Sequence, residues 1–330
     1  MRSINLFRGA TAVVVAALLT TAAGCSAESE AAAGSGGGSV LRVGAIGNAN
    51  ALSGPVGHHL RQGRLVPALA ALGVTDVKVV TFPNGPDLNQ ALAAGELDLA
   101  VYGDTPALVA KGAGQPTRLI AQAQVGLDAG ILAKKAGGPT SIAGLAGRKV
   151  AVQTGSYIHR YLLGALADAR VEPAEVIHIY SSDVEAALER GDVDAAAVPI
   201  ANVEALKAKG YPLIALASKE HPQYLGTSAT VVTEKYLEKQ PGIVAAWQDA
   251  QRAAVRAAKA DWPGFLAYSV SINGFPPAIV EATTVAEQWP EEPFTERGLT
   301  LLAGTKQFLV EQKFVRKDFD LDEWTVRSAA

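Results

Sequence analysis

The chain has 330 residues, of which 49% are hydrophobic and 18% are charged, and its formal net charge at pH 7 is −3. This length is sufficient for two domains of ordinary size. A mildly acidic chain without a long basic run is not typical of proteins that bind nucleic acid, so we expect no nucleic-acid partner.

The N-terminus has the pattern of a secretory signal peptide. Arg2 and Arg8 flank a short polar start, and an apolar stretch rich in Ala, Val and Leu follows over residues 10–23. This stretch is shorter than the roughly 20 apolar residues that a membrane-spanning helix needs, but it fits the apolar core of a signal peptide. We therefore predict that residues 1–24 are a signal peptide.

Cys25 is the only cysteine of the chain and directly follows small residues. This arrangement resembles a bacterial lipobox, in which the thiol is acylated and the cysteine becomes the new N-terminus, although Ala22 stands where a lipobox usually has Leu. An unpaired thiol in an oxidising compartment is otherwise a liability. The alternative is an ordinary signal peptide with an incidental buried cysteine. Residues 25–39, rich in Ala, Ser and Gly, are predicted to be a lipid-anchored flexible linker, with the lipid on Cys25 holding the protein at the outer face of the bacterial cytoplasmic membrane.

From Val40 onward, strand and helix patterns alternate, which indicates βαβ units around mainly parallel sheets. In the first series we expect strands over residues 41–46, 77–82, 97–102, 118–124 and 130–134, and helices over residues 58–72, 87–94 and 106–111. Gly137, Gly138 and Pro139 interrupt this pattern. In the second series we expect strands over residues 149–153, 176–180, 195–198 and 229–233, and helices over residues 157–168 and 183–190, before a mostly helical C-terminal part.

A short internal repeat indicates two similar lobes. Residues 87–100 read DLNQALAAGELDLA and residues 183–196 read DVEAALERGDVDAA, so six of the fourteen positions are identical. Both segments are predicted to be a helix, a glycine stop and a strand that begins next to an aspartate, Asp98 or Asp194. Generic α/β patterning produces weak matches of this kind, so the repeat alone leaves duplication open.

Two segments resemble the aliphatic-sulfonate, taurine and nitrate solute-binding proteins of ABC importers. Residues 79–110 contain the Phe-x-x-Gly turn, the helix that ends in Gly, and the loop Gly-Asp-Thr-Pro at 103–106. Residues 145–166 contain the Leu-x-Gly-Arg-x-Val-Ala-Val strand and the Gly-Ser-x-x-His helix entry. The resemblance covers the chain from Val40 onward and is specific for the superfamily rather than for one ligand.

This resemblance implies the type II periplasmic-binding-protein fold, in which two α/β lobes with mainly parallel sheets are joined by two hinge strands. We expect residues 40–136 and 229–330 to form lobe 1 and residues 137–228 to form lobe 2. The hinges are expected near residues 136–139 and 226–229, and the ligand is expected to bind in the cleft between the lobes.

The two family motifs each place a helix N-terminus after a strand. Asp104 or Thr105 is predicted to be one N-cap, with Pro106 at the first helical position, and Ser156 is predicted to be the other. Free N–H groups and a partial positive charge at two facing helix ends would form an anion site. The same edge of the sheets is predicted to carry further candidate residues: Asn48, Asn84, Thr154, Gly155 and His159. Capping or turn chemistry is the simpler reading of each residue alone.

The chain departs from the family pattern in one segment, which is expected to contact the uncharged part of the ligand. Many sulfonate-binding relatives have a Trp-containing segment after the strand that corresponds to residues 195–198, whereas this chain has Val-Pro-Ile-Ala-Asn over residues 198–202. Asn202 could face the cleft, but no tryptophan stands beside it. A competing source of positive charge for an anion is a cleft cation, Arg61 or Arg160.

The resemblance and the signal peptide together predict an extracytoplasmic, monomeric solute-binding lipoprotein that works with an ABC permease and ATPase and needs no cofactor or metal. The expected ligand is a small anionic organic solute, an aliphatic sulfonate or taurine, with nitrate, a sulfate ester and a pyrimidine precursor open. We expect no enzyme, because the chain has no Gly-x-Ser-x-Gly elbow and no P-loop. A biosynthetic enzyme on the same fold and a ligand-sensing lipoprotein are the alternatives.

Overall fold

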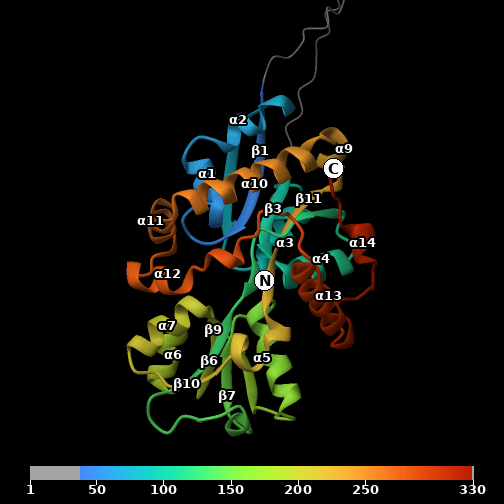
Figure 1. The fold of residues 1–330 in the computed structure, drawn as a ribbon. Helices are drawn as coiled ribbons and strands as arrows, with labels where there is room; N and C mark the ends of the chain where they lie inside the picture. The colour runs from blue at the N-terminus through green and yellow to red at the C-terminus, as the bar shows by residue number, and fades with distance from the viewer. Residues whose placement is uncertain (1–37, 329–330) are drawn as a thin grey trace, which may run out of the picture. The chain divides into compact units, whose positions relative to one another are not determined.

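Two β-sheets organise residues 38–328, the part of the chain that the computed structural model describes (Figure 1). The signal peptide, Cys25 and nearly all of the linker predicted from the sequence lie outside the described residues. Within residues 38–328, no helix combines the length and the apolar composition that a membrane crossing requires.

The first sheet has the strand order β2-β1-β3-β11-β4, and β5 pairs with β11 beside it. Its strands are β1 (Ser39–Ile46), β2 (Val74–Phe82), β3 (Leu99–Gly103), β4 (Thr117–Ala121), β5 (Val125–Leu127) and β11 (Gly226–Thr233). β1 is parallel to both β2 and β3, whereas β11 is antiparallel to both β3 and β4. Therefore β1 to β4 all run in one direction and β11 is the reversed strand between them.

The second sheet has the order β10-β6-β9-β7-β8. Its strands are β6 (Ala129–Ala133), β7 (Lys149–Val152), β8 (Glu175–His178), β9 (Ala195–Pro199) and β10 (Leu213–Leu216). β6 is antiparallel to β9 and β10, whereas β7 is parallel to β8 and β9. The second sheet thus repeats the order of the first, again with one reversed strand. The predicted α/β class with mainly parallel sheets is confirmed.

Helices connect the strands and form most of the C-terminal part. The α-helices are α1 (Gly54–Arg61), α2 (Leu65–Ala68), α3 (Gly85–Ala93), α4 (Asp104–Gly112), α5 (Tyr157–Asp168), α6 (Val184–Arg190), α7 (Ile200–Ala208), α8 (Ala217–Glu220), α9 (Glu234–Lys239), α10 (Ile243–Ala260), α11 (Trp262–Asn273), α12 (Pro277–Thr283), α13 (Glu296–Glu311) and α14 (Leu321–Trp324). Short 3-10 helices span Ala70–Leu72, Ala143–Leu145, Pro222–Tyr224 and Ala286–Gln288.

Each sheet has its own hydrophobic core. On the first sheet, the fully buried Trp247 of α10 belongs to the cluster that contains Leu41 and Val43 of β1. On the second sheet, Tyr161 and other apolar residues of α5 form a cluster with the central strands β7 and β9. Burial of an aromatic side chain of this size is among the largest single contributions to folding. These clusters pack against β1, β7 and β9, and the candidate site lies at the carboxyl ends of strands in the two sheets.

The internal repeat occupies equivalent places in the two sheets, because α3–β3 corresponds to α6–β9. In both sheets the aspartate directly before the strand of this unit binds the neighbouring strand, β1 or β7. The carboxylate of Asp98 accepts from the backbone N–H of Arg42 at 2.9 Å, and that of Asp194 accepts from Lys149 at 3.1 Å. Lys134 lies 2.7 Å from Asp194, and its hydrogen bond is the main cause of the lowered pKa of that carboxyl. The shared geometry supports duplication of the unit.

Two segments differ from the sequence expectation. The single helix predicted over residues 58–72 is wrong: α1, α2 and a 3-10 helix occupy this region, and Gly63 adopts a φ of +70° directly after α1. A left-handed residue at this point ends the helix. In addition, the sequence places residues 129–136 in lobe 1, whereas in the structure β6 pairs with β9 and β10 in the second sheet.

Candidate functional site

Loops at the carboxyl ends of strands in the two sheets contact each other directly. Gln153, which follows β7, donates from Nε2 to the carbonyl oxygen of Pro83 after β2 at 3.1 Å. Asn84 donates from Nδ2 to the hydroxyl of Tyr180, which follows β8, at 3.1 Å. In open α/β sheets, ligands bind at this edge of the strands. The contacts therefore bring the predicted site loops of the two sheets together.

The N-terminus of α5 lies at the centre of this region. Ser156 is the N-cap: its hydroxyl accepts from the backbone N–H of His159 at 3.3 Å and donates to the carbonyl oxygen of Gln153 at 2.6 Å. The N-cap prediction for Ser156 is confirmed. Gly155 has a φ of +74°, and a Cβ added there would lie 3.0 Å from Cγ of Pro86. The first turn of α5 carries no acidic residue, so its partial positive charge is not neutralised locally.

Two histidine rings accept hydrogen bonds from the loop before α5. The backbone N–H of Thr154 lies 3.2 Å from Nδ1 of His178, and the hydroxyl of Thr154 lies 2.8 Å from the same nitrogen. The backbone N–H of Gly155 donates to Nδ1 of His159 at 3.4 Å. Burial, and secondarily the charge of His178, lowers the pKa of His159. The predicted residues Thr154, Gly155, Ser156 and His159 are therefore brought together.

Asp104 and Thr105 occupy a different setting from the one expected. The N-cap of α4 is Gly103, so the prediction that Asp104 or Thr105 caps this helix is wrong, and Pro106 is its third residue. Asp104 is fully buried, and its carboxylate accepts from the N–H groups of Thr105 at 2.5 Å and Thr227 at 2.8 Å. The hydroxyl of Thr105, itself only 3% exposed, donates to Asp104 as well. The N-terminus of α4 is thus already occupied by a carboxylate of the protein.

The three asparagines predicted for the site differ in their contacts. Asn84 is the N-cap of α3, accepting from the N–H of Asp87 at 2.8 Å, and it also reaches Tyr180. Asn202 lies in α7 and donates to the carbonyl oxygen of Ser181 at 3.3 Å, so it borders the same edge of the second sheet. Asn48 is exposed in the loop after β1. Of the three, only Asn84 directly joins the loops of both sheets.

Neither candidate cation lies where the anion is expected. Arg160 is 2% exposed and donates to the backbone carbonyls of Gln223 at 2.8 Å and Leu225 at 3.3 Å. Burial lowers its pKa, and the charge of Asp104 opposes that shift. Arg61 is in the last turn of α1, and its guanidinium lies 5.5 Å from the centre of the Tyr268 ring. Both arginines have structural contacts of their own.

Sequence reasoning missed Gln153, His178 and Tyr180. All three lie at or just after the ends of β7 and β8, and the strand-edge rule that selected the asparagines would also have selected them. No motif marks them, because their contacts depend on how β7 and β8 pair and on which loop of the first sheet lies opposite.

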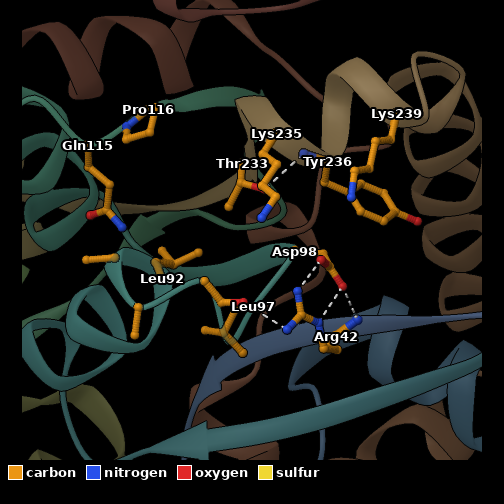
Figure 2. Close-up of a pocket in the computed structure, with 13 residues that line it drawn as sticks. Arg42, Leu92, Leu97, Asp98, Gln115, Pro116, Thr233, Lys235, Tyr236 and Lys239 are labelled. Carbon is orange, nitrogen blue, oxygen red and sulfur yellow. Dashed lines mark hydrogen bonds and ion pairs between the residues drawn. The ribbon is translucent and has the colours of Figure 1, made fainter. Parts of the chain in front are cut away.

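Figure 2 shows a cavity that is separate from these loops. It measures about 380 Å³ and is bordered by Arg42, Asp98 and Lys235 among others. Arg42 and Asp98 form an ion pair of 2.6 Å near the start of β1 and β3, at the opposite ends of these strands from the candidate site. Asp98 accepts from both the backbone N–H and the guanidinium of Arg42, so these two residues connect β1 to the start of β3 and have a structural role.

Comparison with known proteins gives a family match. A family model described as NMT1/THI5 like matches residues 73–262. A protein of Escherichia coli (strain K12) named as an aliphatic sulfonates-binding protein is 34% identical over 122 residues, which are 36% of this chain and 38% of that protein. The taurine-binding periplasmic protein of the same organism is 28% identical over 258 residues, 70% of this chain and 76% of that protein. The chain thus matches well under half of the first relative's length.

Solved structures share the fold. The alkanesulfonate-binding protein SsuA from Xanthomonas axonopodis pv. citri, bound to MOPS, has a TM-score of 0.68 at 24% identity, over 88% of this chain and 98% of that one. A mutant of DSZB in complex with biphenyl-2-sulfinic acid has a TM-score of 0.69 at 18% identity, over 88% of this chain and 96% of that one. DSZB is a desulfurization enzyme, so this fold accommodates both binding proteins and an enzyme.

Proposed function

The chain belongs to the NMT1/THI5-like family, and we propose that it is the solute-binding protein of an ABC importer. Its ligand is a small organic anion, an aliphatic sulfonate or a taurine-like molecule, which is the class named for the two relatives. The observation that carries the proposal is the N-terminus of α5, which lies among contacting loops of the two sheets.

The charges of the helix ends select where the anion binds. Among the long helices that start at the carboxyl ends of strands, α3 and α4 carry Asp87 and Asp104 in their first turns, which disfavour an anion. The first turns of α1, α5 and α7 carry no acid. Hydrogen bonds from backbone N–H groups to a charged oxygen contribute about 1.5–3 kcal/mol each. Of these three helices, α5 follows Gln153, which contacts the opposing loop at Pro83, so we assign the main anion site to the loop over residues 154–156 and the start of α5.

Capture involves closure of two lobes around hinge segments. The chain leaves the first sheet after β5 and enters the second at β6, and it returns at β11. We place the hinges in residues 122–128 and 225–228, which moves the first hinge towards the N-terminus from residues 136–139. The contacts Asn84–Tyr180 and Pro83–Gln153 then join the lobes in the closed form.

The protein acts outside the cytoplasmic membrane. We propose that acylated Cys25 anchors it there, that residues 25–39 link the anchor to the lobes, and that a monomer delivers the solute to a permease and ATPase. The periplasmic taurine-binding relative supports the extracytoplasmic location. Binding without chemistry is proposed because residues 38–328 contain no cysteine that could serve as a nucleophile and the relatives are named as binding proteins.

Isothermal titration of the purified protein with propane-1-sulfonate, taurine, nitrate and a sulfate ester tests the proposal. We expect saturable binding of a sulfonate, about tenfold weaker binding in Ser156→Ala, and unchanged binding in the control Arg61→Ala. Product analysis after prolonged incubation should recover the sulfonate intact. Failure of all four anions to bind, or loss of binding in Arg61→Ala with normal binding in Ser156→Ala, would refute the anion site. Release of sulfite or sulfate would instead show an enzyme.

A further inference from the structure

Two of the backbone N–H groups in the proposed anion site, those of Thr154 and Gly155, donate hydrogen bonds to imidazole rings. His178 is the last residue of β8 and accepts from Thr154, and His159 in the first turn of α5 accepts from Gly155. The two rings come from different elements, β8 and α5. Nδ1 of His178 accepts from the N–H of Thr154, and Nδ1 of His159 accepts from the N–H of Gly155. An anion that binds these N–H groups must replace the ring nitrogens as their acceptor.

The direction of these hydrogen bonds fixes the protonation of the rings. A backbone N–H group can only donate, so Nδ1 of His178 must be an unprotonated acceptor, and the same holds for Nδ1 of His159. The hydroxyl of Thr154 lies 2.8 Å from the same nitrogen of His178. Both rings are therefore neutral in this arrangement, and a proton on either Nδ1 would face an N–H group of the loop.

We propose that solute binding is coupled to protonation of these two rings, with His178 as a ligand-site residue. A proton on Nδ1 ends the hydrogen bond from the loop and releases its N–H group to the anion. The protonated ring adds a positive charge and becomes a donor to the anion itself. This inference rests on the proposed function, because it requires an anion at residues 154–156.

The surrounding charges favour this coupling. The charged residues in the first turns of α3, α4 and α5 are Asp87, Asp104 and Arg160, and the aromatic rings beside the two histidines are Phe314 after α13 and Tyr180 after β8. The Phe314 ring lies edge-on at 5.8 Å from His159, and Tyr180 lies edge-on at 5.0 Å from His178. Asp87 is bound by Asn84, Asp104 by Thr105 and Thr227, and Arg160 by backbone carbonyls. No carboxylate among them raises the pKa of His159.

The affinity for the solute should depend on pH through the pKa of His159. Without solute, burial and the neighbouring His178 keep the pKa of His159 below its ordinary value of 6.5. A bound anion favours the charged ring and raises the pKa of His159. Affinity therefore rises as pH falls from the pKa of the bound state to that of the free state, about tenfold per pH unit for each proton taken up. The gain in affinity ends below the pKa of His159 in the free protein, where this ring is already charged.

Titration calorimetry with propane-1-sulfonate at pH 7.5, 6.5 and 5.5 tests the coupling. Cationic buffers such as Tris and bis-Tris are required, because a sulfonated buffer could occupy the site. We expect binding at pH 5.5 to be about tenfold tighter than at pH 7.5. Heats measured at pH 6.5 in two buffers with different ionisation enthalpies should show proton uptake on binding. This proton count needs no variant, so it remains decisive if a variant fails to fold.

His178→Asn places an amide oxygen near the position of Nδ1, where it can accept from Thr154 but cannot be protonated. We expect this variant to lose most of the pH-dependent gain in affinity. The matched control is His221→Gln, because His221 pairs with Asp168 at 3.3 Å and makes no contact with residues 154–156; it should keep the full gain. Equal wild-type affinity at pH 5.5 and 7.5, no proton uptake, or a full gain in His178→Asn would overturn the inference alone. Absence of sulfonate binding at every pH would refute the proposed function and the inference with it.

Discussion

Replacing Gly155 with Val should weaken solute binding as well as folding. A β-branched residue in the left-handed region, at a φ of +74°, costs roughly 1–2 kcal/mol. The added Cβ would also lie 3.0 Å from Cγ of Pro86 in the opposing loop, whereas carbon atoms pack best at about 3.5–4.0 Å. The two loops must therefore separate by at least about half an ångström, before the two methyl groups of Val are placed.

Gly147→Val is the matched control. Gly147 has a φ of +65° in the second-sheet part of the chain, and a Cβ added there meets no atom within 4 Å. Both variants should lose roughly 1–2 kcal/mol of unfolding free energy in urea denaturation. Only Gly155→Val should lose affinity for propane-1-sulfonate in titration calorimetry, by about tenfold or more, equivalent to about 1.4 kcal/mol. Equal affinities in the two variants would refute the contact between these loops as part of the binding state.

Three further changes test separate parts of the structure. Tyr180→Phe removes the hydroxyl that accepts from Asn84, so calorimetry should show about fivefold weaker solute binding, equivalent to about 1 kcal/mol, and unchanged affinity would argue against a closing role. Asp104→Asn turns an amide nitrogen towards N–H donors such as that of Thr227, so urea denaturation should show a loss of about 2 kcal/mol of unfolding free energy; undiminished stability would contradict this. Cys25→Ser should release the protein from the membrane fraction or leave it unprocessed, and fractionation identical to wild type would rule out the lipid anchor.

Local chemistry explains what the sequence could predict. The span of α5 and the N-cap Ser156 follow from residues within one turn of each other, and the structure has α5 over Tyr157–Asp168 as expected. The same local rule failed at α4. The carboxylate of Asp104 is bound by Thr227 and Thr305, which are 123 and 201 residues away in sequence, and these distant donors draw it into the interior instead of leaving it as a cap.

Contacts between strands and lobes could not be read from the sequence. His178 reaches Thr154 only because β7 and β8 pair with Val152 opposite His178. Tyr180 reaches Asn84 only because the loops of the two sheets contact each other. The order β10-β6-β9-β7-β8 likewise places β6 in the second sheet through pairing with β9, a partner more than sixty residues later in the chain.

The amide signals of residues 154–156 report directly on whether the backbone N–H groups at the start of α5 bind the anion. In a 15N-labelled sample titrated with propane-1-sulfonate, backbone N–H groups that bind the anion should move downfield as their hydrogen bonds strengthen. We predict saturable downfield shifts of the Gly155 and Ser156 amide protons, with the same dissociation constant as calorimetry gives. If these amides remain unshifted at saturation while signals elsewhere change, the anion is held by other groups and the account of this site is wrong.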